Sequence, residues 1–227
     1  MKLFTLLSSL SFCGFLALSA CSNPFAPKTQ PPSVIEPIAP PAPPATTPEQ
    51  LMDNLDRAMS TRDKDLYESL LDKDFLFTEP DCLGEVVYFN NLEEELEMMG
   101  GSRDGSQLGI FEAFRDFDFD FELTRRFQEL GSEHPESFPG DPDGHPDEDW
   151  EVFYGRVQML MLDENGNGFR VDQFMTYKLR FDPEDGEDGL WKIVRWENDA
   201  LAGDCGGAGK RLANVFSWAA LKQQVAP

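Results

Sequence analysis

The polar side chains best placed for chemistry lie on strand faces that are otherwise apolar. In residues 168–181 every second residue shares one face, and Gln173 and Tyr177 are its polar members. Arg195 lies on an alternating face of the last predicted strand. An amide, a phenol and a guanidinium directed into a cavity can bind a ligand, and a tyrosine can act as an acid beside a helical aspartate. The simpler interpretation is that Gln173 and Tyr177 form hydrogen bonds within a core.

No paired acid and histidine lies on the predicted strands, so no catalytic group can be assigned from the sequence. His134 and His145 both lie in the acidic stretch 131–148 and each precedes a proline, which is not a recognisable zinc motif. We therefore predict neither a metal site nor a cofactor. Carboxylates this dense could hold Ca²⁺, although such runs are usually solvated loops; they are Asp141, Asp143, Asp147, Glu148 and Asp149.

Cys21 is the last residue of an N-terminal segment whose pattern could direct covalent modification of this cysteine. Residues 1–20 carry one charge, Lys2, and an apolar run too short to span a bilayer of about 30 Å, as in a secretory signal. The residues Leu18-Ser19-Ala20-Cys21 resemble the lipobox of bacterial lipoproteins. In that family the thiol is lipidated, the signal is cleaved before it, and the new amino group is acylated. The alternative is ordinary secretion with a free thiol at Cys21.

The rest of the chain divides by composition. Residues 21–47 are rich in proline and predict an extended, disordered tether. Residues 48–202 are expected to form one domain, and residues 203–227 a glycine-rich linker with a short C-terminal helix or tail. A spacer behind Cys21 suits an anchored domain. By resemblance to Gram-negative lipoproteins, a serine after the cysteine implies the outer membrane of the cell envelope.

The charge balance limits the partners. The formal net charge is −23, which disfavours nucleic acid and anionic lipid headgroups. The expected partners are the membrane, through the lipid on Cys21, and either a small apolar ligand or an envelope protein. A homodimer formed through the sheet face is compatible with both.

The hydrophobic periodicity predicts the elements that position these residues. Phe117, Phe119 and Phe121 alternate with acids, which is typical of a strand buried on one face. Helices are expected from Pro48, from Asp63 and after Asn91, and strands near 74–77, 85–89, 117–122, 150–162, 168–181 and 190–197.

Two segments carry a resemblance to a known fold. They are Pro48-Glu49-Gln50-Leu51 with Asp63-Lys64-Asp65-Leu66-Tyr67-Glu68-Ser69-Leu70-Leu71, and Leu190-Trp191-Lys192-Ile193-Val194-Arg195-Trp196. Together with the element order they resemble the nuclear transport factor two-like superfamily, over nearly all of 48–198. The resemblance implies an α+β cone with N-terminal helices on a curved antiparallel sheet, and makes 131–148 an insertion. The superfamily hosts dehydratases, isomerases, cyclases, adaptors and assembly modules, so it leaves the function open.

The resemblance also bears on the remaining cysteines and on function. Its first strand pair lies beside its last strand, so Cys82 and Cys205 could form a disulfide in an oxidising envelope; two independent thiols are the alternative. We expect a non-catalytic lipoprotein whose cone binds a ligand or a protein. The alternative is a lyase or isomerase acting on a small hydrophobic substrate. An open cone with a titratable group would favour the enzyme, and a filled cone the binding module.

Overall fold

The computed structural model describes residues 40–81, 83–141, 143–186, 189–200 and 215–225. The predictions that concern Cys21, Cys82 and Cys205 lie outside these residues. From Pro41 onward the chain forms one compact unit. Within the described ranges, no helix has both the length and the apolar character needed to cross a membrane.

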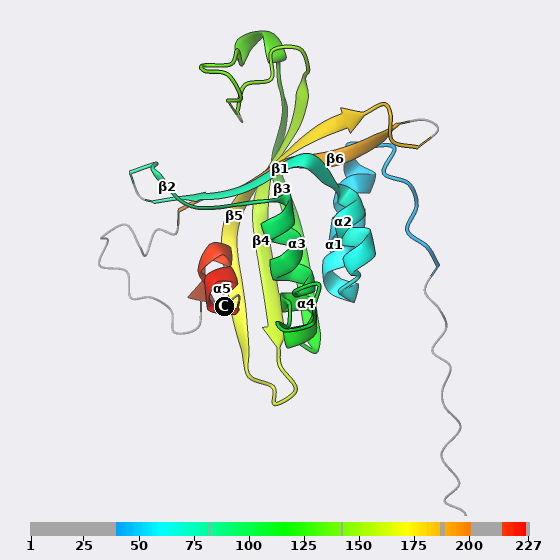
Figure 1. The fold of residues 1–227 in the computed structure, drawn as a ribbon, viewed down its shortest axis with the longest axis vertical. Helices are drawn as coiled ribbons and strands as arrows, with labels where there is room; N and C mark the ends of the chain where they lie inside the picture. Colours follow the sequence, from blue (N-terminus) through cyan, green and yellow to red (C-terminus); the bar gives the residue numbers. More distant parts are fainter. Residues whose placement is uncertain (1–39, 82, 142, 187–188, 201–214, 226–227) are drawn as a thin grey trace, which may run out of the picture. The chain divides into compact units, whose positions relative to one another are not determined.

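Helices and strands are interspersed along the chain, and the predicted α+β class is confirmed (Figure 1). The elements are α1 (Pro48–Thr61), α2 (Lys64–Leu70), β1 (Leu71–Pro80), β2 (Val86–Asn91), α3 (Leu92–Gly100), α4 (Ile110–Ala113), β3 (Asp116–Glu129), the 3₁₀ turn η1 (Gly131–Glu133), β4 (Trp150–Leu162), β5 (Gly168–Asp182), β6 (Leu190–Asn198), β7 (Val215–Phe216) and α5 (Trp218–Val225).

Side-chain caps set the helix starts. Thr47 accepts a hydrogen bond from the Gln50 amide at 3.1 Å, and Asp63 caps α2 in the same way. Asn91 and Glu94 form a reciprocal capping box at the start of α3. These local signals explain why the helix positions could be predicted from the sequence.

The sheet has the strand order β2-β1-β6-β5-β4-β3, with β7 paired to β5. β3, β4, β5 and β6 form an antiparallel meander, but β1 pairs with β6 in parallel. The prediction of a purely antiparallel sheet was therefore wrong at this pair and at β5 with β7, which is also parallel. Helices and further strands intervene between β1 and β6, and such a crossover allows the two to run in the same direction.

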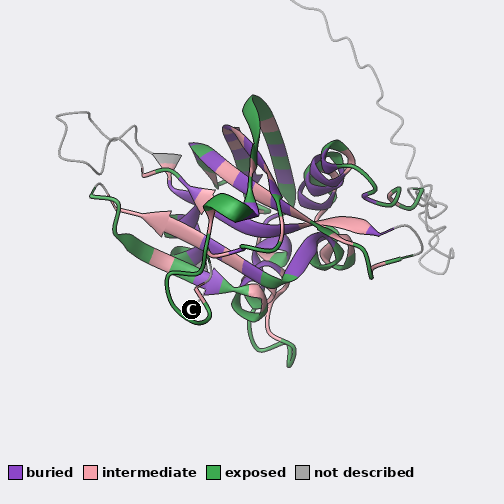
Figure 2. Ribbon diagram, turned by 90° about the horizontal axis from the view of Figure 1, so that it is seen from above, coloured by how far each residue is buried: buried purple, intermediate pink, exposed green. Residues whose placement is uncertain are grey.

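Burial alternates along the strands (Figure 2). Phe117 and Phe119 are buried in β3, whereas Asp118 and Asp120 are exposed, as the period of two predicts. Most of the buried strand residues share one core cluster with the buried helix residues, whereas Trp150, Val152 and Val194 are buried outside it. We call the space between the sheet and the helices the cone interior.

The last residues of the predicted tether belong to the domain. The Asn54 side-chain amide donates to the Pro43 carbonyl at 2.8 Å, and the Trp191 amide donates to the Ala45 carbonyl at 2.8 Å. Ala45 is buried. Because these bonds join the segment to both α1 and β6, the folded unit begins before residue 48, the boundary that composition suggested.

Candidate functional site

Four polar residues from four elements meet in the cone interior and form the interior cluster: Tyr67, Asn90, Glu95 and Lys222. The side chains of Glu95 on α3 and Lys222 on α5 are fully buried, and Lys222 Nζ lies 2.5 Å from Glu95 Oε2. Tyr67 donates its hydroxyl to Glu95 Oε1 at 2.7 Å, and Asn90 donates its amide to Glu95 Oε2. The carboxylate is therefore compensated by a cation and two neutral donors, as a buried charge requires.

Aromatic rings complete the surroundings of the Lys222 ammonium. Nζ lies 3.6 Å from the centroid of Phe77, 5.2 Å from Trp218 and 5.4 Å from Trp196. Burial lowers the pKa of Lys222, and the charge of Glu95 opposes that shift. Desolvated cation–π contacts of this kind contribute about 2 kcal/mol. α5 thus places the Lys222 ammonium between the Glu95 carboxylate and three aromatic rings.

Tyr177 lies in this interior, as the alternation predicted. It is fully buried, and its hydroxyl is 3.7 Å from the Met175 sulfur. Burial raises the pKa of Tyr177 well above its ordinary value, and the charge of Glu95 adds to the effect. Its ring packs against Phe121 and Trp196. A phenol with this pKa and a thioether partner is a packing residue rather than an acid placed for proton transfer.

Gln173 is also buried, and it joins β5 to the start of α5. Its amide donates to the Asp199 carbonyl at 2.5 Å and to Glu79 Oε2 at 3.3 Å. Its oxygen accepts from the Trp218 backbone amide at 3.1 Å. The side chain that the sequence offered as a ligand contact is therefore satisfied by the protein itself.

The structure places Arg195 on the opposite face of the sheet. Lys178 is paired with Arg195 and the next residue, Leu179, with Ile193, so β6 has one extra residue at this point. Such a bulge breaks the simple alternation from which the interior position was predicted. Arg195 lies 5.4 Å from the Trp150 ring centroid and donates to the Asp74 carbonyl at 2.8 Å. It is not part of the interior cluster.

The cone interior is filled by α5. Trp218 and Lys222 have no exposed surface, and the Trp218 ring stacks on Trp196 with centroids 6.3 Å apart. Trp218 also meets Phe117 edge to face at 6.5 Å. Neither Glu95 nor Lys222 was predicted as a site residue from the sequence. The sequence signal for α5 is one helical face shared by Trp218, Leu221 and Lys222. A lysine on such a face is normally expected to extend its charged end into solvent, so its burial could not be predicted.

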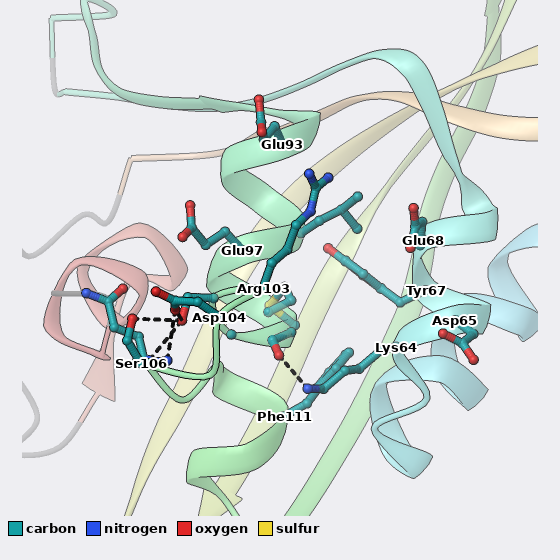
Figure 3. A pocket seen from close by; sticks show the side chains of 16 residues that line it. Lys64, Asp65, Tyr67, Glu68, Glu93, Glu97, Arg103, Asp104, Ser106 and Phe111 are labelled. Carbon is teal, nitrogen blue, oxygen red and sulfur yellow. Dashed lines mark hydrogen bonds between the residues drawn. The ribbon is translucent and has the colours of Figure 1, made fainter.

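A concavity lies outside the core, between α2, α3 and the loop after α3 (Figure 3). It encloses about 570 Å³, and its lining includes Tyr67 and the charged residues Lys64, Glu68, Glu97 and Arg103. Lys64 is already paired with Glu112 and with the Gly100 carbonyl. Tyr67 donates its hydroxyl to the buried Glu95, so this hydroxyl is already engaged inside the core. The lining therefore offers exposed charges but no convergent acid and base.

No family model and no curated protein matches the chain. Among solved structures, the chain is similar to an NTF2-like protein of unknown function in nutrient uptake from Rhodospirillum rubrum, with 18% identity, 66% of this chain and 95% of that chain covered, and a TM-score of 0.39. It is similar to a ketosteroid isomerase-like protein from Erwinia carotovora atroseptica, with 12% identity and a TM-score of 0.39. This match covers 68% of this chain and 93% of that chain. It is also similar to the beta subunit of the benzoate 1,2-dioxygenase from Burkholderia mallei, with 12% identity and a TM-score of 0.41. This match covers 67% of this chain and 87% of that chain. Likenesses this distant assign neither a family nor an activity to this chain.

Proposed function

We propose that the chain is a lipid-anchored lipoprotein of the bacterial cell envelope whose domain is a non-catalytic, protein-binding module. The observation that carries the second half of the proposal is the filled cone interior, in which Trp218 and Lys222 of α5 are fully buried. The lipobox-like residues ending at Cys21 and the proline-rich segment behind them support the first half.

The packed interior favours binding over the alternative of a lyase or isomerase. Such an enzyme needs an open pocket with convergent polar groups and a titratable side chain that reaches the substrate. Here the carboxylate of Glu95 is bound by Tyr67, Asn90 and Lys222, and Gln173 is bound by backbone groups. These contacts engage the Glu95 carboxylate and the Gln173 amide, although Asn90 Oδ1 and Trp218 Nε1 are buried without a hydrogen-bond partner among the described residues. A small apolar ligand would have to displace α5.

The edge strand β2 favours a protein as the partner. Among the described strands it ends the sheet beside β1, so no described strand pairs with its outer backbone groups. Val86, Val87 and Phe89 on this strand are 57%, 62% and 65% exposed. An edge strand with apolar side chains is suited to strand addition by an extended segment of another chain.

A photo-crosslinking amino acid at Val87 is expected to capture one discrete envelope protein in cells. The same group at Asp53, exposed on α1, serves as the control and should give no such product. Lysine at both Val86 and Phe89, introduced beside the crosslinker, should remove most of the captured product, because charge on a strand edge opposes pairing. Equal capture from Val87 and Asp53 would contradict the proposal. A product of twice the chain's mass would instead identify a homodimer as the occupant of this edge.

The anchor has its own test. Cells expressing the chain should incorporate an alkyne-tagged fatty acid into it, and Cys21→Ala should abolish the label because the acceptor thiol is gone. Cys13→Ala, within the predicted signal, is the matched control and should retain the label. Persistent labelling of Cys21→Ala would refute the lipid anchor while leaving the binding proposal untouched.

A further inference from the structure

Glu129, His134 and His145 bring three metal-binding groups together where the loop after β3 folds back on the sheet; we call them the His–Glu trio. The three side chains each offer one ligand atom, and these atoms lie within 4.8 Å of one another. We propose that the trio binds one Zn²⁺ ion and thereby fixes the loop between β3 and β4 to the sheet.

The hydrogen bonds of the two imidazoles leave the correct nitrogen for a metal. His134 Nδ1 lies 3.0 Å from the Leu130 carbonyl, and His145 Nδ1 lies 2.8 Å from the Glu148 carbonyl. A carbonyl oxygen only accepts, so each Nδ1 carries the proton and each neutral ring keeps its lone pair on Nε2. Metal-bound histidines in proteins are oriented by this same pairing with a carbonyl.

Two of the ligand atoms are buried without a hydrogen bond. Among the described residues, neither His145 Nε2 nor Glu129 Oε2 has a hydrogen-bond partner. The His145 side chain is 1% exposed, and its Nε2 lies 3.6 Å from Glu129 Oε2. Two ligands of a tetrahedral zinc ion, each bonded at about 2.1 Å, are about 3.4 Å apart. The pair is therefore already spaced as ligands of one ion, which would satisfy both atoms at once.

The surroundings hold Glu129 and His145 in place. The His145 ring stacks on Trp150 with centroids 3.7 Å apart. The His134 ring lies nearly parallel to the His145 ring, with centroids 4.8 Å apart, so it must turn before both Nε2 lone pairs can meet at one ion. The His145 amide donates to the His134 carbonyl at 2.9 Å. Lys178 Nζ lies 3.2 Å from Glu129 Oε1 and so orients the other carboxylate oxygen. His134 is only half-buried, so its ring can move the remaining distance toward an ion, and the fourth position is left for water.

Nitrogen-rich ligands select a late transition metal rather than Ca²⁺. Two imidazoles and one carboxylate form a set that Zn²⁺ commonly takes, whereas Ca²⁺ requires six to eight oxygen ligands. This ligand set could not be predicted from the sequence, because Glu129 precedes the loop and the histidine spacing matches no motif. The alternative is a protonated His145 that pairs with Glu129 and binds no metal.

The test is a calorimetric Zn²⁺ titration of the full chain, purified in detergent and stripped with EDTA. At about 0.15 M salt, screening weakens diffuse attraction to the acidic surface. We expect one Zn²⁺ per chain. His134→Gln and Glu129→Gln should each reduce the affinity by more than the about 10–100-fold that loss of an outer-shell partner causes. Asp147→Asn, an exposed loop carboxylate outside the trio, should bind as the parent does.

Unfolding by urea separates a lost ligand from a lost fold. Without metal, His134→Gln should unfold at the same urea concentration as the parent, whereas Glu129→Gln should unfold earlier because it removes the partner of Lys178. One equivalent of Zn²⁺ should stabilise the parent and Asp147→Asn alone. Failure of the folded parent to bind Zn²⁺ would overturn the proposal and leave the ion pair as the role of His145. Binding that all the variants share, or several weak equivalents that grow at low salt, would overturn it as well.

Discussion

Lys222→Met is expected to lower the free energy of unfolding by about 3–5 kcal/mol, which is the cost of leaving a buried charge without its partner. Glu95 remains in the cone interior after this change, with only the neutral donors Tyr67 and Asn90 to compensate it. Methionine retains most of the lysine stem, so the loss reports on charge more than on volume. Urea denaturation of the full chain, followed by tryptophan fluorescence, measures the difference.

A double variant and a surface control sharpen this result. Glu95→Leu combined with Lys222→Met removes both charges, so it should recover most of the stability that the single change loses. Lys73→Met alters an exposed lysine on β1 and should change the free energy of unfolding by no more than about 0.5 kcal/mol. A Lys222→Met protein as stable as Lys73→Met would mean that the ammonium does not enter the interior.

Trp218→Ala should lower the free energy of unfolding by about 3–5 kcal/mol, because it removes the largest α5 side chain from the core. The space left beside Trp196 and Phe117 is walled largely by apolar rings and should accept a planar aromatic molecule. Added indole is therefore expected to raise the thermal midpoint of the variant through binding to the folded state.

The parent chain and a second core variant serve as comparisons for that rescue. In the parent the Trp218 side chain occupies this position, so indole should cause no shift. Leu221→Ala removes a fully buried neighbour on the same helix but leaves a smaller hole, so it should be destabilised without being rescued. Equal stabilisation of the parent by indole would indicate an open interior and would revive the ligand-binding and enzyme alternatives.

The parts of this fold that could be predicted from the sequence are those that local chemistry decides. Thr47, Asp63 and Asn91 cap their helices through bonds to residues three positions away. The alternation around Phe117 and Phe119 marks a strand with one buried face, and the structure confirms it. These signals depend only on residues that are close together in the sequence.

The candidate sites depend on contacts that no local pattern encodes. Glu95 and Lys222 are far apart in sequence, and each looks like an ordinary helix surface residue until α3 and α5 face the same interior. The extra residue in β6 places Arg195 on the other face, since a bulge shifts the side-chain alternation by one position. Glu129 joins the two histidines only because the loop folds back onto the end of β3.

The position of α5 after all the other described elements sets the order in which the core can form during synthesis. Trp218, Leu221 and Lys222 are fully buried core residues, and they are made after their partners in the other elements. Until they emerge, Glu95 lacks its cation and the interior lacks its largest aromatic contact from α5. The domain cannot complete its core before α5 has been synthesised. Partly made chains that lack α5 are therefore expected to expose apolar surface that α5 covers in the folded domain.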